Sequence, residues 1–156
     1  MQIRLAGEKD LESLVDLWIE LMEYHGSFGL QLLIDKSKRA AIETFIIELL
    51  SKKNSRMYVM VDTEKVIALL IARIEQRPGM FIHQKSGYIA ETIVSKSFQG
   101  KGIGEELANA AHQWFQEEHV AFSELQVSIQ NDKAVTFWKS KGYEPQTLRM
   151  IRVMKN

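Results

Sequence analysis

The sequence contains no cysteine, which excludes disulfides, cysteine-ligated zinc or iron–sulfur sites, and thiol nucleophiles. Stability does not require such cross-links, because a chain of 156 residues buries roughly 68–70% of its unfolded surface on folding. The absence of cysteine also fits a reducing compartment. Because the sequence also has no apolar run long enough to cross a bilayer and no signal-peptide pattern in residues 1–10, we expect a cytoplasmic protein.

Neither sign of charge is in surplus, because 20 Lys and Arg residues balance 20 Asp and Glu residues. This balance argues against nucleic acids and membranes as partners, since anionic polymers and surfaces attract basic proteins. The longest apolar run, residues 66–72, is far shorter than the roughly 20 residues that cross a bilayer. Residues 1–10 also lack the charged and then apolar pattern of a signal peptide.

Proline is equally scarce, with Pro78 and Pro145 as its two occurrences. No stretch rich in proline, glycine or serine divides the chain, and no internal repeat is present. We therefore expect one domain over residues 1–156.

Hydrophobic periodicity predicts alternating helices and strands. We expect helices over residues 10–25, 37–52 and 103–118, and a short one between Asn131 and Gly142. We expect strands over residues 1–5, 57–62, 65–75, 86–95, 124–130 and 148–154. Because helices and strands alternate only partly along the chain, the pattern predicts an α/β fold with a mixed sheet.

A glycine-rich turn follows the strand over residues 86–95 and begins the next helix. The turn consists of Gln99, Gly100, Lys101, Gly102, Ile103 and Gly104. Backbone amides and the helix dipole at such a position favour a bound anion. The spacing is not that of a dinucleotide fingerprint, because Leu107 stands where the third glycine is required, nor that of a P-loop, because no Lys-Ser/Thr pair follows. The turn predicts a phosphate or pyrophosphate site; the alternative is a plain connection between strand and helix.

A second segment, residues 131–143, has the sequence NDKAVTFWKSKGY. It resembles the Asn-x-x-Ala-x-x-Phe-Tyr-x-x-x-Gly-Phe segment of the GNAT superfamily of acyl-CoA N-acyltransferases. The glycine turn is similar to that family's Arg/Gln-x-x-Gly-x-Gly/Ala pyrophosphate loop, matched here by Gln99, Gly102 and Gly104. The resemblance implies a single-domain GNAT-like fold, in which helices flank both faces of a mixed central sheet.

The resemblance also implies that acetyl-CoA enters a cleft between two splayed parallel strands, here residues 86–95 and 124–130, with its pyrophosphate on the glycine turn. Ile93 and Val94 are then expected to contact the pantetheine arm through their backbones, while their side chains belong to the core. Lys101 either adds charge against a phosphate or is an ordinary exposed lysine. No metal is expected.

An alkylamine with a pKa of about 10.4 must lose a proton before it attacks a thioester, so the transfer requires a base. Glu91 is the candidate, because the family places an acidic residue on this strand near the acceptor. The alternative for Glu91 is a surface or ion-paired carboxylate. A β-bulge in this strand would prevent its orientation from being inferred by alternation.

Trp138 stands where the family usually has a general-acid tyrosine, and an indole N–H does not supply a proton. A thiol pKa of about 8.5 makes the thiolate a fair leaving group without an acid. Trp138 is therefore expected to contact the cofactor only. Asn131 is expected either to bind pantetheine, as the resemblance implies, or simply to cap its helix.

The resemblance implies a transferase that moves an acetyl group from acetyl-CoA to a primary amine on a small molecule, a peptide N-terminus or a lysine. The alternative is a non-catalytic acyl-CoA-binding sensor or regulatory protein. The family's acceptor pocket corresponds to residues 25–35 and 77–85. Family members are often dimers through their last strands, and the apolar residues in 148–154 permit a homodimer.

Overall fold

The structure is a computed structural model that describes residues 1–155. Contacts between residues divide the chain into two compact units, Met1–Gln126 and a second that begins at Val127.

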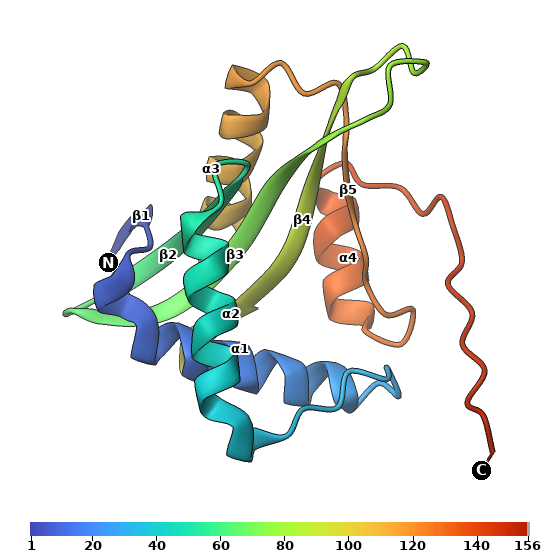
Figure 1. The fold of residues 1–156 in the computed structure, drawn as a ribbon. Helices are drawn as coiled ribbons and strands as arrows, with labels where there is room; N and C mark the ends of the chain where they lie inside the picture. The colour runs from blue at the N-terminus through green and yellow to red at the C-terminus, as the bar shows by residue number, and fades with distance from the viewer. Residues whose placement is uncertain (156) are drawn as a thin grey trace. The chain divides into compact units, whose positions relative to one another are not determined.

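The first unit is built on a five-stranded sheet with the strand order β1-β2-β3-β4-β5 (Figure 1). The strands are β1 (Gln2–Leu5), β2 (Ser55–Asp62), β3 (Lys65–Gln76), β4 (Lys85–Val94) and β5 (Ser123–Leu125). Strands β1 to β4 pair antiparallel, whereas β4 and β5 pair parallel. The predicted mixed sheet is thereby confirmed.

Helices cover both faces of this sheet (Figure 1). They are α1 (Leu11–Gly26), α2 (Arg39–Ser51) and α3 (Ile103–Glu117). The apolar sides of α1 and α2 form one core with β2, β3 and β4, whereas α3 packs on the opposite face. Residues 66–72 of β3 are buried throughout, because a strand with helices on both faces has no side exposed to water.

Close packing between β4 and α3 depends on Gly87. A Cβ atom at this position would lie 2.8 Å from ring atoms of Phe115. A side chain at position 87 would therefore push α3 away from the sheet. Glycine at this point lets the helix lie directly on the strand that carries the candidate site.

The second unit contains α4 (Asp132–Ser140), which ends before Gly142 with a φ of +87°. The expected strand over residues 148–154 is wrong, since this segment has no strand structure and Met150 is 85% exposed. The expected strand over 124–130 is too long, because β5 ends at Leu125. A segment rich in apolar residues forms a strand only where a neighbouring strand supplies hydrogen-bond partners.

Candidate active site

Strands β4 and β5 pair over only a short distance, and their last pair is Ile89 with Leu125. Strand β4 continues to Val94, so from Ala90 onward its edge on the β5 side has no strand partner among the described residues. Such an edge presents N–H and C=O groups to an extended ligand. Ile93 lies in this stretch, and its buried side chain leaves only its backbone for such a contact.

The other edge of β4 contains a β-bulge at the same place. Ile71 of β3 pairs with Glu91 whereas Ala72 pairs with Ile89, which leaves Ala90 without a partner. Bulges interrupt the hydrogen-bond ladder and often lie next to active sites. Backbone groups of β4 are therefore available at Ala90, where a preorganised N–H is suited to stabilise a developing oxyanion.

The glycine turn carries the chain from β4 into α3. Gly100 and Gly102 have φ angles of +77° and +79°, which other residues rarely adopt. Gly102 is the N-cap of α3, and its carbonyl accepts hydrogen bonds from the amides of Glu105 and Glu106 at 3.0 and 3.1 Å. The amides of Ile103 and Gly104, which precede these two, have no acceptor within the helix, so this helix start is suited to bind a phosphate.

Three side chains of the turn have different roles. The Gln99 amide donates to the Val94 carbonyl at 3.1 Å, which ties the turn to the end of β4. Ile103 is buried in the core. Lys101 is exposed, and its ammonium lies 4.8 Å from the centre of the Phe98 ring. The charge of Lys101 and the backbone amides are therefore the groups of the turn that can meet an anion.

Glu91 lies on the sheet face that α1 and α2 cover, because its ladder partner Ile71 belongs to the core on that face. Its Oε2 atom is buried, with no hydrogen-bond partner in the described part of the chain. Burial raises the pKa of Glu91 from 4.5 to about 7, against the opposing effect of the Arg73 cation. A carboxylate with a pKa near neutrality is suited to accept a proton from an amine.

Arg73 of β3 is a neighbour of Glu91 that the sequence does not reveal. Strand alternation predicts only that Arg73 and Glu75 share a face of β3. Their closeness to Glu91 depends on the register between β3 and β4 and on the bulge at Ala90, both of which are set by tertiary structure.

The two predicted contacts in the second unit have clear local roles. The side-chain oxygen of Asn131 accepts the Ala134 amide at 3.2 Å, which confirms the helix cap. The Trp138 ring packs edge to face against Phe137 and Tyr143, at 4.8 and 5.4 Å between ring centres. Contact of Asn131 and Trp138 with a coenzyme stays a prediction.

The loop after α1, expected to line the acceptor pocket, exposes apolar side chains such as Leu33. His25 precedes it, and burial lowers the pKa of this histidine. The β3–β4 hairpin, the other expected contributor, exposes Met80 and Ile82 at its tip. Both segments therefore offer apolar contacts to an acceptor.

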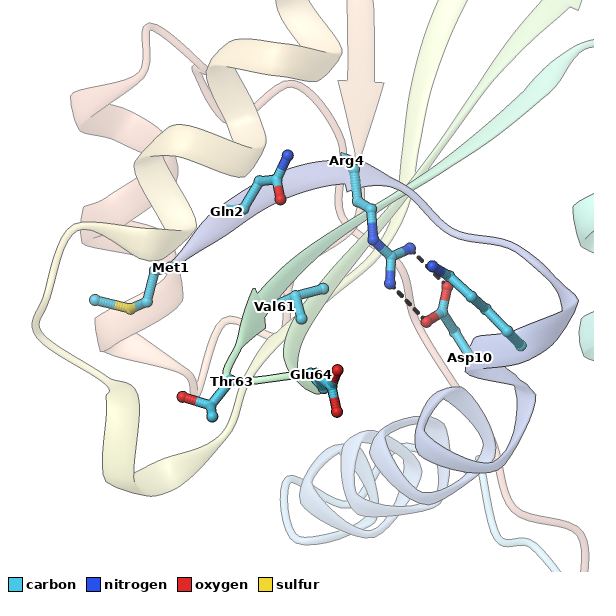
Figure 2. A pocket seen from close by; sticks show the side chains of 8 residues that line it. Met1, Gln2, Arg4, Asp10, Val61, Thr63 and Glu64 are labelled. Atoms are coloured by element: carbon cyan, nitrogen blue, oxygen red, sulfur yellow. Dashed lines mark hydrogen bonds and ion pairs between the residues drawn. The ribbon is translucent and has the colours of Figure 1, made fainter.

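A separate open cavity of about 510 Å³ lies beside the start of the chain and contains none of the predicted site residues (Figure 2). Arg4 in its wall donates two hydrogen bonds, of 2.7 and 2.8 Å, to the two carboxylate oxygens of Asp10. Asp10 also accepts the Gly7 amide at 2.9 Å. Arg4 holds the pKa of Asp10 below its usual value. The pair therefore neutralises its own charges and joins β1 to the start of α1.

Over residues 1–155, no three His, Asp or Glu side chains are placed to hold a metal ion together. None of the helices in this range has both the length and the apolar character that crossing a membrane requires.

Comparisons with known proteins agree with this geometry. The curated relative MJ1207 of Methanocaldococcus jannaschii, described as an uncharacterized N-acetyltransferase, is 32% identical over 87 residues. These residues are 53% of this chain and 35% of that protein, so the match spans about a third of the relative's length.

Solved structures match over nearly the whole chain. A mutant of the BH1408 protein from Bacillus halodurans is 25% identical with a TM-score of 0.88, covering 99% of this chain and 100% of that one. Aminoglycoside N-acetyltransferase AAC(6')-Iy in complex with CoA is 17% identical with a TM-score of 0.77, covering 99% and 93%. The latter likeness shows the fold alone.

The model of the acetyltransferase (GNAT) family matches residues 14–143, which include both motifs of the resemblance and every predicted site residue. The predicted GNAT-like architecture is confirmed by these structures and by the parallel β4–β5 pair. The chain therefore belongs to the acetyltransferase (GNAT) family.

Proposed function

We propose that the protein is an N-acetyltransferase that moves an acetyl group from acetyl-CoA to a primary amine. The observation that carries the proposal is the course of β4. From Ala90 onward its edge on the β5 side has no strand partner among the described residues and leads directly into the anion-suited glycine turn. The same strand carries Glu91, whose Oε2 atom is buried. Family membership and the CoA bound to AAC(6')-Iy support the choice of cosubstrate.

In this proposal the coenzyme is held mainly by backbone groups. The amides that begin α3 and the Lys101 ammonium bind the pyrophosphate. The free edge of β4 pairs with pantetheine as an added strand would. This arrangement directs the thioester carbonyl to the bulge at Ala90.

Glu91 then takes a proton from the acceptor nitrogen, directly or through water. The nitrogen attacks the thioester carbonyl, a backbone N–H at the bulge stabilises the oxyanion, and the C–S bond breaks as the C–N bond is completed. The sulfur leaves as a thiolate, and the second proton that the nitrogen loses as the amide forms goes to this thiolate or to water. Trp138 supplies no proton, and none is required, because a thiolate is a fair leaving group near neutral pH.

An amine on a small molecule is the acceptor that we favour. AAC(6')-Iy, which shares the fold, is an aminoglycoside N-acetyltransferase. An acceptor screen should therefore compare small-molecule amines with peptide N-termini and with lysine side chains.

Calorimetric titration with acetyl-CoA tests the cofactor assignment, with ATP and NAD as controls. We expect saturable binding of acetyl-CoA alone. Gly104→Val should weaken it more than tenfold, about 1.4 kcal/mol, because a side chain in the first turn of α3 blocks the approach of the pyrophosphate. Gly7→Val is the matched control, because Gly7 has open space and an extended backbone. Equal affinity in Gly104→Val and wild type would remove the glycine turn from the site.

Thiol release with a panel of amines separates the enzyme from the non-catalytic alternative. Glu91→Gln should lower kcat at least a hundredfold at pH 7 with acetyl-CoA affinity nearly intact, because general-base catalysis contributes about 10²–10⁴-fold. Acetyl-CoA binding with no thiol release from any amine would favour a sensor of acyl-CoA. Full activity of Glu91→Gln across the pH range would dismiss Glu91 as the base.

A further inference from the structure

A group of polar side chains lies beside Glu91 on the face of β3 and β4 that α1 and α2 cover. Arg73 of β3 pairs with Tyr88 of β4, and Ile71 pairs with Glu91. Residues that face each other across a ladder share a face, as do alternate residues along a strand. Tyr88 and Glu91 are three positions apart, and they share this face because of the bulge at Ala90.

The Arg73 guanidinium is held from two directions. Its Cζ lies 4.5 Å from the centre of the Tyr88 ring, and its Nε donates to Glu75 Oε1 at 2.8 Å. The Arg73 and Glu75 side chains are each 43% exposed, so water still reaches the pair. Stacking on a ring and a charged hydrogen bond together restrict a long side chain that would otherwise move freely.

Arg73 lies diagonally across the β3–β4 ladder from Glu91, because Arg73 pairs with Tyr88 and Glu91 pairs with Ile71. From this position its positive charge opposes the rise in the pKa of Glu91 that burial causes. The inward residues of α1 and α2 are apolar, and burial favours the neutral form of His25 at the end of α1. The charges of Glu75 on β3 and Glu124 on β5 act on Tyr88. Among the described residues, Arg73 is therefore the group that offsets the burial of the Glu91 carboxylate.

We propose that Arg73 is a positioning residue for Glu91: its guanidinium, held by Tyr88 and Glu75, favours the ionised form of the carboxylate, which is the form that accepts the acceptor's proton. This inference rests on the proposed function and deepens it. Glu75 competes with Glu91 for the same guanidinium. Removing Arg73 and removing Glu75 should therefore have opposite effects on Glu91.

The test measures the pH dependence of kcat/KM in wild type, Arg73→Gln and Glu75→Gln. In Arg73→Gln we expect the acidic limb to move to higher pH by about 0.5 to 1 unit, as expected for loss of a half-exposed cation. In Glu75→Gln the limb should move to lower pH, because Arg73 is released toward Glu91. At a pH well above the limb, Arg73→Gln should regain the wild-type kcat/KM.

Arg56→Gln is the matched control. Arg56 belongs to the same sheet and also stacks on a ring, 4.8 Å from the centre of Trp114, but it does so on the α3 face. Its loss should leave the acidic limb in place. An unmoved limb in Arg73→Gln, or shifts of the same direction in Arg73→Gln and Glu75→Gln, would overturn the inference.

Carbon NMR of the labelled Glu91 carboxyl repeats the titration without substrates. This readout separates the two proposals. Should wild type release no thiol with any amine, the proposed function fails, and the carboxyl titration still decides whether Arg73 sets the ionisation of Glu91. A Glu91 titration identical in wild type and Arg73→Gln would overturn the inference even in an active enzyme.

Discussion

At the scale of single residues, the burial that suits Glu91 to its proposed role as the base has a cost in stability. Its pKa of about 7 in the folded state lies above the usual value of 4.5. Between these values the folded protein holds more protons than the unfolded chain, so this carboxyl makes stability fall as the pH rises from about 4.5 through 7. The buried negative charge that the proposed base requires therefore opposes folding at and above neutral pH.

Glu91→Gln should accordingly be more stable than wild type at alkaline pH, by about 2 to 3 kcal/mol at pH 8, because an uncharged amide avoids the burial of a charge. The gain should vanish toward pH 4, where the wild-type carboxyl is neutral in both states. Urea denaturation at several pH values measures the difference. Glu124→Gln removes an exposed carboxylate on β5 and should change stability by less than about 0.5 kcal/mol. A gain independent of pH in Glu91→Gln would contradict this account.

At the scale of elements, the β2–β3 hairpin has an unfavourable turn. Thr63 and Glu64 have φ angles of +45° and +70°, consecutive left-handed residues as in a type I′ turn. Such turns favour Asn-Gly, because glycine adopts positive φ without a steric penalty. The strands on either side form long ladders with their neighbours, and this pairing holds the turn in place.

Glu64→Gly should therefore raise the free energy of unfolding by about 0.5 to 1 kcal/mol, since it relieves the left-handed strain at this position. Thermal and urea denaturation measure the effect. Glu64→Ala removes the same charge but keeps a Cβ atom, so it should give no comparable gain. Equal stability of Glu64→Gly and Glu64→Ala would show that backbone strain is not the cause.

At the scale of the whole molecule, the charges cancel, with a formal net charge of zero at pH 7 and an isoelectric point near 6.9. A protein without net charge has little long-range repulsion between copies. At low salt, we expect the second virial coefficient from light scattering to be lowest near pH 7. It should rise toward pH 5.5 and 8.5, and a coefficient independent of pH would contradict this expectation.

The extent of the domain, the cytoplasmic location and a homodimer stay predictions.

Much of the fold follows from local sequence patterns. Helices α1, α2 and α3 have apolar residues at helical spacing, and strands β2, β3 and β4 are rich in β-branched and other apolar residues. Both patterns can be recognised from residues that are close in the chain. The glycine turn is equally local, because the positive φ angles at Gly100 and Gly102 favour glycine, which adopts them without a steric penalty. These patterns, with the segment around Asn131, were sufficient to predict the family and the glycine turn as a candidate site.

Tertiary structure alone decided the surroundings of Glu91 and the extent of the last strands. Residues 148–154 are rich in apolar residues, yet they form no strand, because a strand also needs a partner. The bulge at Ala90 reverses the alternation of β4 and brings Tyr88, Arg73 and Glu91 together. Bulges and register arise when strands distant in sequence pack against each other, and a pattern that repeats every two residues carries no information about where that repeat is interrupted.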